Sequence, residues 1–372
     1  MKTLYIILSL ALILASCDTI SDKSAQTKPS ALEQLKSSID SLFNAEIRKN
    51  EPGAALLVAY KGKMLIGKGY GLRDVDSQEP ITASTNMRMA SVSKQFTALC
   101  ILALVDQGKL KLNDNAIDYL PYPIFEGITI EQLANHTSGL PDYYEYFNKN
   151  WNKESVLENQ EVLDWLATNP ERVFQPGEKW EYSNTAYLML ALIVEKVSGQ
   201  EFSAFAKENV FQKAGMKNTN YYNLANPIEI AERAFCYEID SAGNINKVDG
   251  FFMNGVMGDG AVYTSINDYF QYDLALRDSA ILSPQIHEII FKTSSEYEVN
   301  GTDRYYAMGW SVTDSTAAHT GGWYGTNTYT KRYLDRPLTY AIFMNRNTLF
   351  ENRLLQKTDS LITQYLKNQN NL

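Results

Sequence analysis

One helical segment, residues 92 to 106, constrains this fold more than any other part of the sequence. It lies in the stretch ASVSKQFTALCILALVDQGKL, residues 90 to 110, and its apolar residues leave no broad polar face. A helix that is apolar nearly all round is buried on all sides, so the rest of the chain must surround it. Gly108 is suited to end this helix. Its polar residues gather in the first two turns, and one of them is Lys94, whose charge is costly to bury without a partner.

Ser91 and Lys94 are three residues apart and therefore share one face of this helix. Unpaired backbone N–H groups at a helix N-terminus can stabilise a developing oxyanion beside such a serine. Burial favours a neutral lysine and a neighbouring phenol or carboxylate favours a charged one, but in either state Lys94 can help to move the Ser91 proton. The alternative is a capping serine followed by a lysine that reaches the surface. Ser93 points about 100° further round the helix from Lys94 and is expected to be ordinary.

A second pattern, Tyr182-Ser183-Asn184, stands between the turn FQPGEKW and the apolar helical run TAYLMLALIVEKVSG. A phenol is a poor base unless a cation such as Lys94 stabilises its phenolate. The same Tyr-x-Asn spacing recurs in loops, at Tyr146 with Asn148 and at Tyr221 with Asn223. Tyr182 differs from these because the helix that follows supplies the stiff support that an active-site side chain needs.

A third pattern is AAHTGGWYG, in which His319 and Thr320 stand at the end of a short predicted strand. Gly321 and Gly322 would let another backbone approach closely. We expect an edge strand beside the nucleophile, which docks an extended substrate and supplies an oxyanion N–H from Gly322. The alternative for His319 is a structural histidine.

Other kinds of site find less support in the sequence. There is no G-x-S-x-G elbow, Walker A motif or Rossmann fingerprint, and the three histidines lack metal-ligand spacing. Ser138, with His136 nearby, is more simply explained by the turn at Gly139 and Pro141. A net charge of −9 without a Lys/Arg-rich stretch argues against nucleic acid as a partner. We expect no metal and no cofactor.

The N-terminus indicates export and anchoring. Lys2 precedes an apolar stretch that is too short to span a membrane, and Leu14-Ala15-Ser16-Cys17 is typical of a bacterial lipobox. We therefore predict a signal peptide over 1–16, a lipid on Cys17 and a polar tether over 17–29, with the protein facing the periplasm or the exterior. Ordinary signal cleavage beside an unrelated cysteine is the alternative. We expect Cys100 and Cys236 to be free buried thiols.

The remaining patterns predict an α/β (α+β) architecture. Ser30 and Glu33 form a capping box for a first helix that Glu51-Pro52-Gly53 would stop, and residues 54 to 71 resemble a β-hairpin turning at Lys61-Gly62. Short helices and turns fill a helical lobe over roughly 112–250. Strand patterns return after about 255, and an amphipathic helix over residues 350 to 367 closes the chain. We expect two terminal helices around a sheet assembled from both ends of the chain.

These patterns, in this order, resemble the serine β-lactamase and penicillin-binding protein superfamily, in particular its class C β-lactamase-like branch of D,D-peptidases and esterases. The resemblance covers roughly residues 30 to 367 and includes LANHTSGLPDY, FQPGEKWEYSNTAYLMLALIVEKVSG, GDGAVYTSINDYFQY and HTGGWYG. It implies a mainly antiparallel sheet flanked by helices, with an all-helical lobe and a cleft between them. It also implies that residues 30–372 are one serine hydrolase domain.

By this resemblance Ser91 is the acylated nucleophile, Lys94 shares its proton, and Tyr182 is the general base. Asn184 resembles the residue that positions Lys94 and the substrate amide.

The motif His319-Thr320-Gly321 takes the place of the family's Lys-Thr-Gly, and the N–H groups of Ser91 and Gly322 would form the oxyanion hole. Histidine carries less positive charge than lysine at neutral pH, so an efficient β-lactamase is not expected.

The function expected from the sequence is a membrane-anchored serine hydrolase that forms an acyl-enzyme with an amide or ester, with D-Ala-D-Ala and other D-amino-acid peptides as candidate substrates. A carboxylesterase for small acyl esters is one alternative. A non-catalytic homologue that binds cell-wall fragments is another, although the intact set of Ser91, Lys94 and Tyr182 argues against it.

Overall fold

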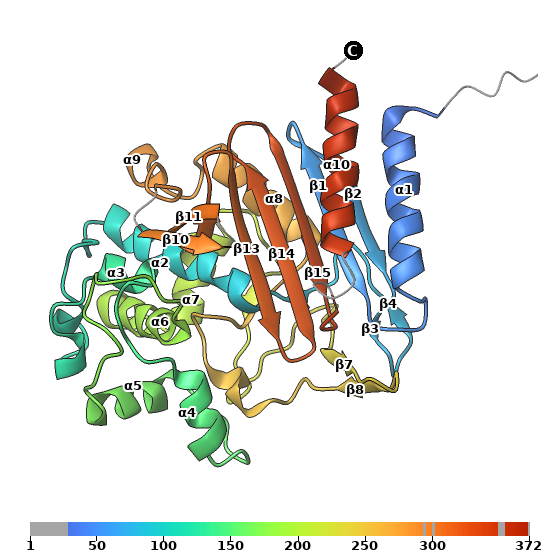
Figure 1. Ribbon diagram of the computed structural model, residues 1–372. Helices are drawn as coiled ribbons and strands as arrows, with labels where there is room; N and C mark the ends of the chain where they lie inside the picture. The colour runs from blue at the N-terminus through green and yellow to red at the C-terminus, as the bar shows by residue number, and fades with distance from the viewer. Residues whose placement is uncertain (1–28, 293–294, 300–301, 349–353, 371–372) are drawn as a thin grey trace, which may run out of the picture.

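A computed structural model describes residues 29–292, 295–299, 302–348 and 354–370 (Figure 1). The predicted signal peptide and nearly all of the tether lie outside these residues and stay predictions. An antiparallel sheet runs through the molecule in the order β10-β11-β12-β13-β14-β15-β1-β2. Its strands are β1 (Ala54–Tyr60), β2 (Lys63–Tyr70), β10 (Ser295–Val299), β11 (Thr302–Ala307), β12 (Trp310–Val312), β13 (Thr316–Trp323), β14 (Thr326–Tyr333) and β15 (Leu338–Met344). The mainly antiparallel sheet expected from the sequence is confirmed.

Strand β1 joins the two ends of the chain. It forms the predicted hairpin with β2, and the turn residues Lys61 and Gly62 have φ angles of 51° and 71°. On its other side β1 pairs with β15 along its whole length, from Ala54 opposite Met344 to Tyr60 opposite Leu338. The sheet is therefore built from both ends of the sequence, as predicted. Helices cover both of its faces, so the residues of β1 are almost all buried.

Helices α1 (Ala31–Glu46) and α10 (Leu354–Asn370) lie side by side on one face of the sheet (Figure 1). The capping box of α1 is present: the Glu33 N–H donates to Ser30 Oγ over 3.2 Å, and the Ser30 N–H donates to the Glu33 carboxylate over 2.7 Å. The helix ends before the predicted stop at residues 51–53. Ile47 is already extended and packs its side chain into the core under α1 and α10.

The opposite face carries α2 (Lys94–Asp106) and α8 (Ile266–Arg277). The short 3₁₀ turn η1 (Ala90–Ser93) precedes α2, and Gly108 follows it with a φ of 67°. The expectation of a helix buried on all sides is confirmed, because every residue from Lys94 to Leu104 is buried. Cys100 in this helix and Cys236 are both buried free thiols, as expected.

Beside α2 lies a lobe of helices, drawn mainly in green in Figure 1. It contains α3 (Ile130–Ala134), α4 (Tyr143–Asn150), α5 (Asn159–Thr168), α6 (Asn184–Ser198) and α7 (Phe202–Ala206). The span 112–250 is not helical throughout: from residue 220 onward it forms β6 (Asn220–Tyr221), β7 (Tyr237–Ile239) and β8 (Ile245–Lys247). Strand β6 belongs to a small sheet in which β9 (Val262–Thr264) lies between β5 (Met87–Arg88) and β6. No helix among the described residues is long and apolar enough to span a bilayer.

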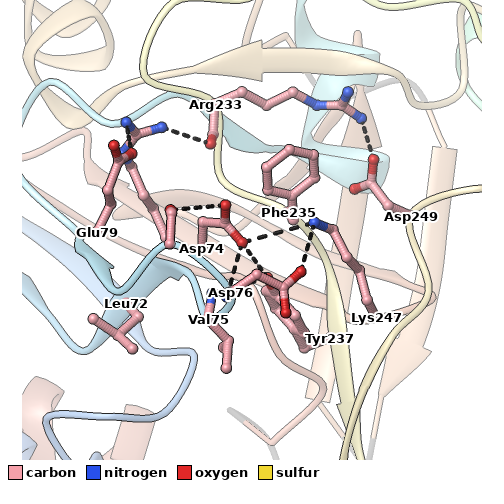
Figure 2. Close-up of polar contacts among 12 residues, drawn as sticks. Leu72, Asp74, Val75, Asp76, Glu79, Arg233, Phe235, Tyr237, Lys247 and Asp249 are labelled. Carbon is pink, nitrogen blue, oxygen red and sulfur yellow. Dashed lines mark hydrogen bonds and ion pairs between the residues drawn. The ribbon is translucent and has the colours of Figure 1, made fainter.

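Figure 2 shows how the β7–β8 hairpin is fixed to the segment around β3 (Leu72–Asp74) and β4 (Glu79–Pro80). The ammonium of Lys247 lies 3.7 Å from Asp74 and 3.5 Å from Asp76. The Tyr237 hydroxyl donates to Asp74 over 3.0 Å and accepts from a backbone N–H over the same distance. These contacts fix the β7–β8 hairpin against the β3–β4 segment.

Candidate active site

The turn η1 places Ser91 where α2 meets strand β13. A Cβ atom added to Gly321 of β13 would lie 2.5 Å from the Met89 carbonyl oxygen and 2.2 Å from Thr328 Oγ1, so only glycine allows this contact. The expected close approach is therefore confirmed at Gly321. It is not found at Gly322, where the nearest atom to an added Cβ would be 3.8 Å away, because this residue faces the opposite side of the strand.

Lys94 is fully buried, and its ammonium donates three hydrogen bonds. The acceptors are Asn184 Oδ1 at 2.9 Å, the Asp259 carbonyl oxygen at 2.9 Å and Ser91 Oγ at 3.3 Å. An ammonium has three N–H donors, so each has an acceptor, and the cost of burying the group is reduced accordingly. The rings of Tyr182 and Tyr187 add cation–π contacts at 4.9 Å and 5.5 Å.

The segment that carries Tyr182 is held by a histidine. Ser183 caps α6, accepting from the Ala186 N–H over 3.2 Å, and donates its own N–H to His136 Nδ1 over 3.1 Å. The His136 ring lies 4.3 Å from the Tyr182 ring. Burial lowers the pKa of His136 well below its ordinary value, so this ring is a neutral support for Tyr182. The sequence favoured a simple turn here, and it gave no reason to connect His136 with Tyr182.

His319 lies in the middle of β13, not at its end, and β13 is an interior strand, not an edge strand. Strand β12 pairs with β13 only at Ala317 and Ala318. Because β12 is short, residues 319–323 of β13 extend beyond it, and the edge of β13 that faces β12 is not paired with it there. The second half of β13 thus has the open side that the sequence led us to expect from an edge strand.

His319 is a buried and neutral residue. Its Nδ1 lies 2.6 Å from the Thr320 carbonyl oxygen, and its Nε2 lies 2.8 Å from the Tyr306 hydroxyl. A carbonyl oxygen only accepts, so Nδ1 carries the proton and Nε2 accepts from Tyr306. Burial, reinforced by the charge of Lys94, lowers the pKa of His319 to about 3. In this position a lysine would offer a cation, whereas His319 offers none.

Two cavities open on either side of Tyr182. The first, of about 230 Å³, is lined by Ser91, Tyr182, Asn184 and Gly322, and also by Arg88 and Asp259. The second, of about 350 Å³, is lined by His319 and Thr320 together with Arg304 and several aromatic rings. The structure therefore brings every predicted catalytic and substrate-binding residue to one place, whereas the predicted lipidation site Cys17 lies outside the described residues. It adds Arg88, Asp259 and Arg304, for which the sequence predicted no role in the site.

The comparisons with known proteins agree with this geometry. The family model described as Beta-lactamase matches residues 39–362. Penicillin-binding protein 4* of Bacillus subtilis (strain 168) is 32% identical over 341 residues, which cover 87% of this chain and 75% of that protein. The penicillin binding protein of Bacillus halodurans superposes with a TM-score of 0.76 at 24% identity, covering 88% of this chain and 98% of that one. The D-amino acid amidase of Ochrobactrum anthropi SV3 gives a TM-score of 0.74 at 20% identity, covering 91% and 99%.

The buried neutral state of His319 predicts a pH dependence of stability. Its pKa in the folded protein, about 3, lies below the ordinary value of 6.5. Below about pH 6.5 the unfolded chain therefore binds a proton that the folded chain does not. The free energy of unfolding consequently decreases as the pH is lowered, by up to about 1.4 kcal/mol per pH unit. Urea unfolding of wild type and His319→Asn between pH 4 and pH 7 measures this contribution. We expect a shallower slope in the variant, and equal slopes would contradict a neutral buried His319.

Proposed function

Because the chain belongs to the beta-lactamase family of serine hydrolases, we propose that it hydrolyses amides or esters whose leaving group carries a carboxylate, with peptides that end in a D-amino acid as the first substrates to test. The observation that carries this proposal is Arg304 in the second cavity. The proteins to which this chain is similar include one named as a penicillin-binding protein and one named as a D-amino acid amidase, and these names support the choice of D-amino-acid peptides.

The proposed reaction begins when Ser91 Oγ attacks the substrate carbonyl carbon. Lys94 donates to Ser91 Oγ and lies 4.9 Å from the centre of the Tyr182 ring, so Tyr182 together with Lys94 removes the Ser91 proton. The backbone N–H groups of Ser91 and Gly322 stabilise the oxyanion, since both residues line the first cavity. The C–N or C–O bond then breaks, and Tyr182 returns its proton to the leaving group. A water molecule hydrolyses the serine ester by the same steps.

Recognition of the leaving group falls to Arg304. His319 stands where a lysine would bind a carboxylate, and it is neutral with both ring nitrogens engaged. Arg304, which is half-buried, lines the same cavity, and its Nε is buried without a hydrogen-bond partner in the described part of the chain. A guanidinium in this setting binds a carboxylate well.

The rest of the second cavity suits a small apolar group beside that carboxylate. Its wall includes the stacked rings of Trp180 and Tyr297, whose centroids are 4.1 Å apart. Thr320, which is exposed on the open half of β13, offers a hydroxyl as a further donor.

The test compares an N-acylated D-Ala-D-Ala peptide with its C-terminal amide. Wild type should hydrolyse the free acid with a kcat/KM at least about 10-fold higher, since a hydrogen bond to a charged group contributes about 1.5–3 kcal/mol. Arg304→Gln should bring the ratio close to one. Arg336→Gln, at an exposed arginine paired with Asp335, is the matched control and should keep the wild-type ratio.

Other outcomes point to the alternatives. Hydrolysis of nitrophenyl esters without hydrolysis of either peptide would identify a carboxylesterase. Binding of cell-wall peptides with no turnover of any substrate would identify a non-catalytic binding protein, and either result would contradict the proposal.

We also propose that Cys17 carries a lipid that anchors the protein to a bacterial membrane, on the support of the residues Leu14-Ala15-Ser16-Cys17. In cells that express the full chain, wild type should fractionate with membranes and show a lipid mass on Cys17, and Cys17→Ser should be released. A variant that stays with the membrane would contradict this anchor.

A further inference from the structure

The first cavity contains two charged side chains that the proposed reaction does not use. Arg88 comes from β5, which pairs with β9 at Tyr263, and Asp259 comes from the segment just before β9. The small sheet therefore places an arginine and an aspartate in the same cavity as Ser91.

Arg88 is a buried cation for which the described residues supply neither a hydrogen-bond acceptor nor an ion pair. Its side chain is only 4% exposed, and its Nε is buried with no hydrogen-bond partner among the described residues. No ion pair of the described residues includes it, and its guanidinium carbon lies 6.0 Å from the centre of the Tyr263 ring. A buried guanidinium without acceptors is costly, so the cavity must supply them as water or as part of a ligand.

Asp259 connects this cavity to the reactive lysine. Its backbone carbonyl accepts from Lys94 over 2.9 Å, and its Oδ2 accepts from the Tyr143 hydroxyl over 3.1 Å. The side chain is 6% exposed, and burial raises the pKa of this carboxyl. The charge of Arg88 acts on both Asp259 and Tyr143, yet Arg88 and Asp259 do not come within ion-pair distance of each other. The first cavity is thus lined by a donor and by an acceptor that do not pair with each other.

The charges of the surrounding side chains determine which chemical group suits the first cavity between Arg88 and Asp259. An added anion would be repelled by the negative charge of Asp259, and an added cation would be repelled by the positive charges of Arg88 and Lys94. A neutral group with one acceptor and one donor complements both sides, and an amide is such a group. We propose that Arg88 and Asp259 form a subsite for an amide in the acyl part of the substrate, with the amide oxygen accepting from Arg88 and the amide N–H donating to Asp259.

This inference rests on the proposed function, because Ser91 must be the nucleophile for the acyl part to occupy the first cavity. The remaining walls are apolar and aromatic, from Tyr143, Val256 and Trp323. The Trp323 indole is fixed by a 2.8 Å hydrogen bond to Asn254, so this wall is held in one orientation. An acyl chain with a carbon spacer that ends in an amide fits such a cavity.

Boronic acids test the subsite directly, because boron bonds to a serine oxygen and its substituent takes the place of the acyl group. We would measure affinities by calorimetry for phenylboronic acid and for its 3-methyl, 3-carbamoyl and 3-carboxy derivatives. Wild type should bind the carbamoyl probe about 10-fold more tightly than the methyl probe. The ratio should fall towards one in Arg88→Met. In Asp259→Asn the affinity for the carboxy probe should increase relative to that for the carbamoyl probe, because the carboxylate that repels the carboxy probe has been removed.

Equal binding of the methyl and carbamoyl probes by wild type would overturn the subsite, and this result does not depend on whether the variants fold. A wild-type preference for the carboxy probe would overturn it as well. Arg336→Gln, at an exposed arginine outside both cavities, is the matched control and should keep the wild-type ratio. If phenylboronic acid binds wild type and Ser91→Ala equally, the proposed function itself fails, and the subsite fails with it.

Discussion

The rest of the site depends on the buried ammonium of Lys94. The helix that carries it is enclosed on all sides, and the charge is tolerated there because three oxygens accept hydrogen bonds from it, two of them from distant parts of the chain. Asn184 comes from the start of α6, and Asp259 comes from the segment before β9. The same three hydrogen bonds therefore hold the helical lobe, the small sheet and Ser91 in one arrangement. The same contacts meet two requirements. They supply acceptors for a charge that is buried in the core, and they hold a cation beside the nucleophile.

The neutral state of His319 determines how charge is distributed around Ser91. His319 is neutral and donates its Nδ1 proton to the chain itself, so it supports β13 and leaves the binding of charged groups to other residues. Two arginines with buried Nε atoms lie on either side of Tyr182, Arg88 in the first cavity and Arg304 in the second. The carboxylate of Asp259 shares the first cavity with Arg88, whereas none of the described residues that line the second cavity carries a carboxylate. This difference is why we assign a neutral amide to one side and a carboxylate to the other.

Much of this arrangement could be predicted from local patterns. The capping box at Ser30, the hairpin at Lys61-Gly62 and the buried helix from Lys94 each depend on residues close together in sequence, and all three are confirmed. The spacing of Ser91 and Lys94 predicted their contact for the same reason. The end of α1 and the interior position of β13 were predicted wrongly, because they are decided by how Ile47 and β12 pack against distant strands.

The parts of the site that the sequence did not reveal depend on long-range register. Arg88 and Asp259 share a cavity only because β5 pairs with β9, and His136 supports Tyr182 only because its loop reaches the start of α6. The neutral state of His319 follows from burial and from the charge of Lys94, which lies far from it in the sequence. Residues of these types occur widely in loops and strands, so their spacing in the sequence did not identify them as site residues.

The central claim is that Ser91, held beside the buried Lys94, is the nucleophile. Intact-protein and peptide mass spectrometry after treatment with a fluorophosphonate probe tests it most directly. The account predicts a single adduct on Ser91 in wild type, none in Ser91→Ala, and an adduct in Ser93→Ala, whose lost hydroxyl accepts a hydrogen bond from strand β9 and takes no part in the reaction. An adduct that persists in Ser91→Ala would contradict the account.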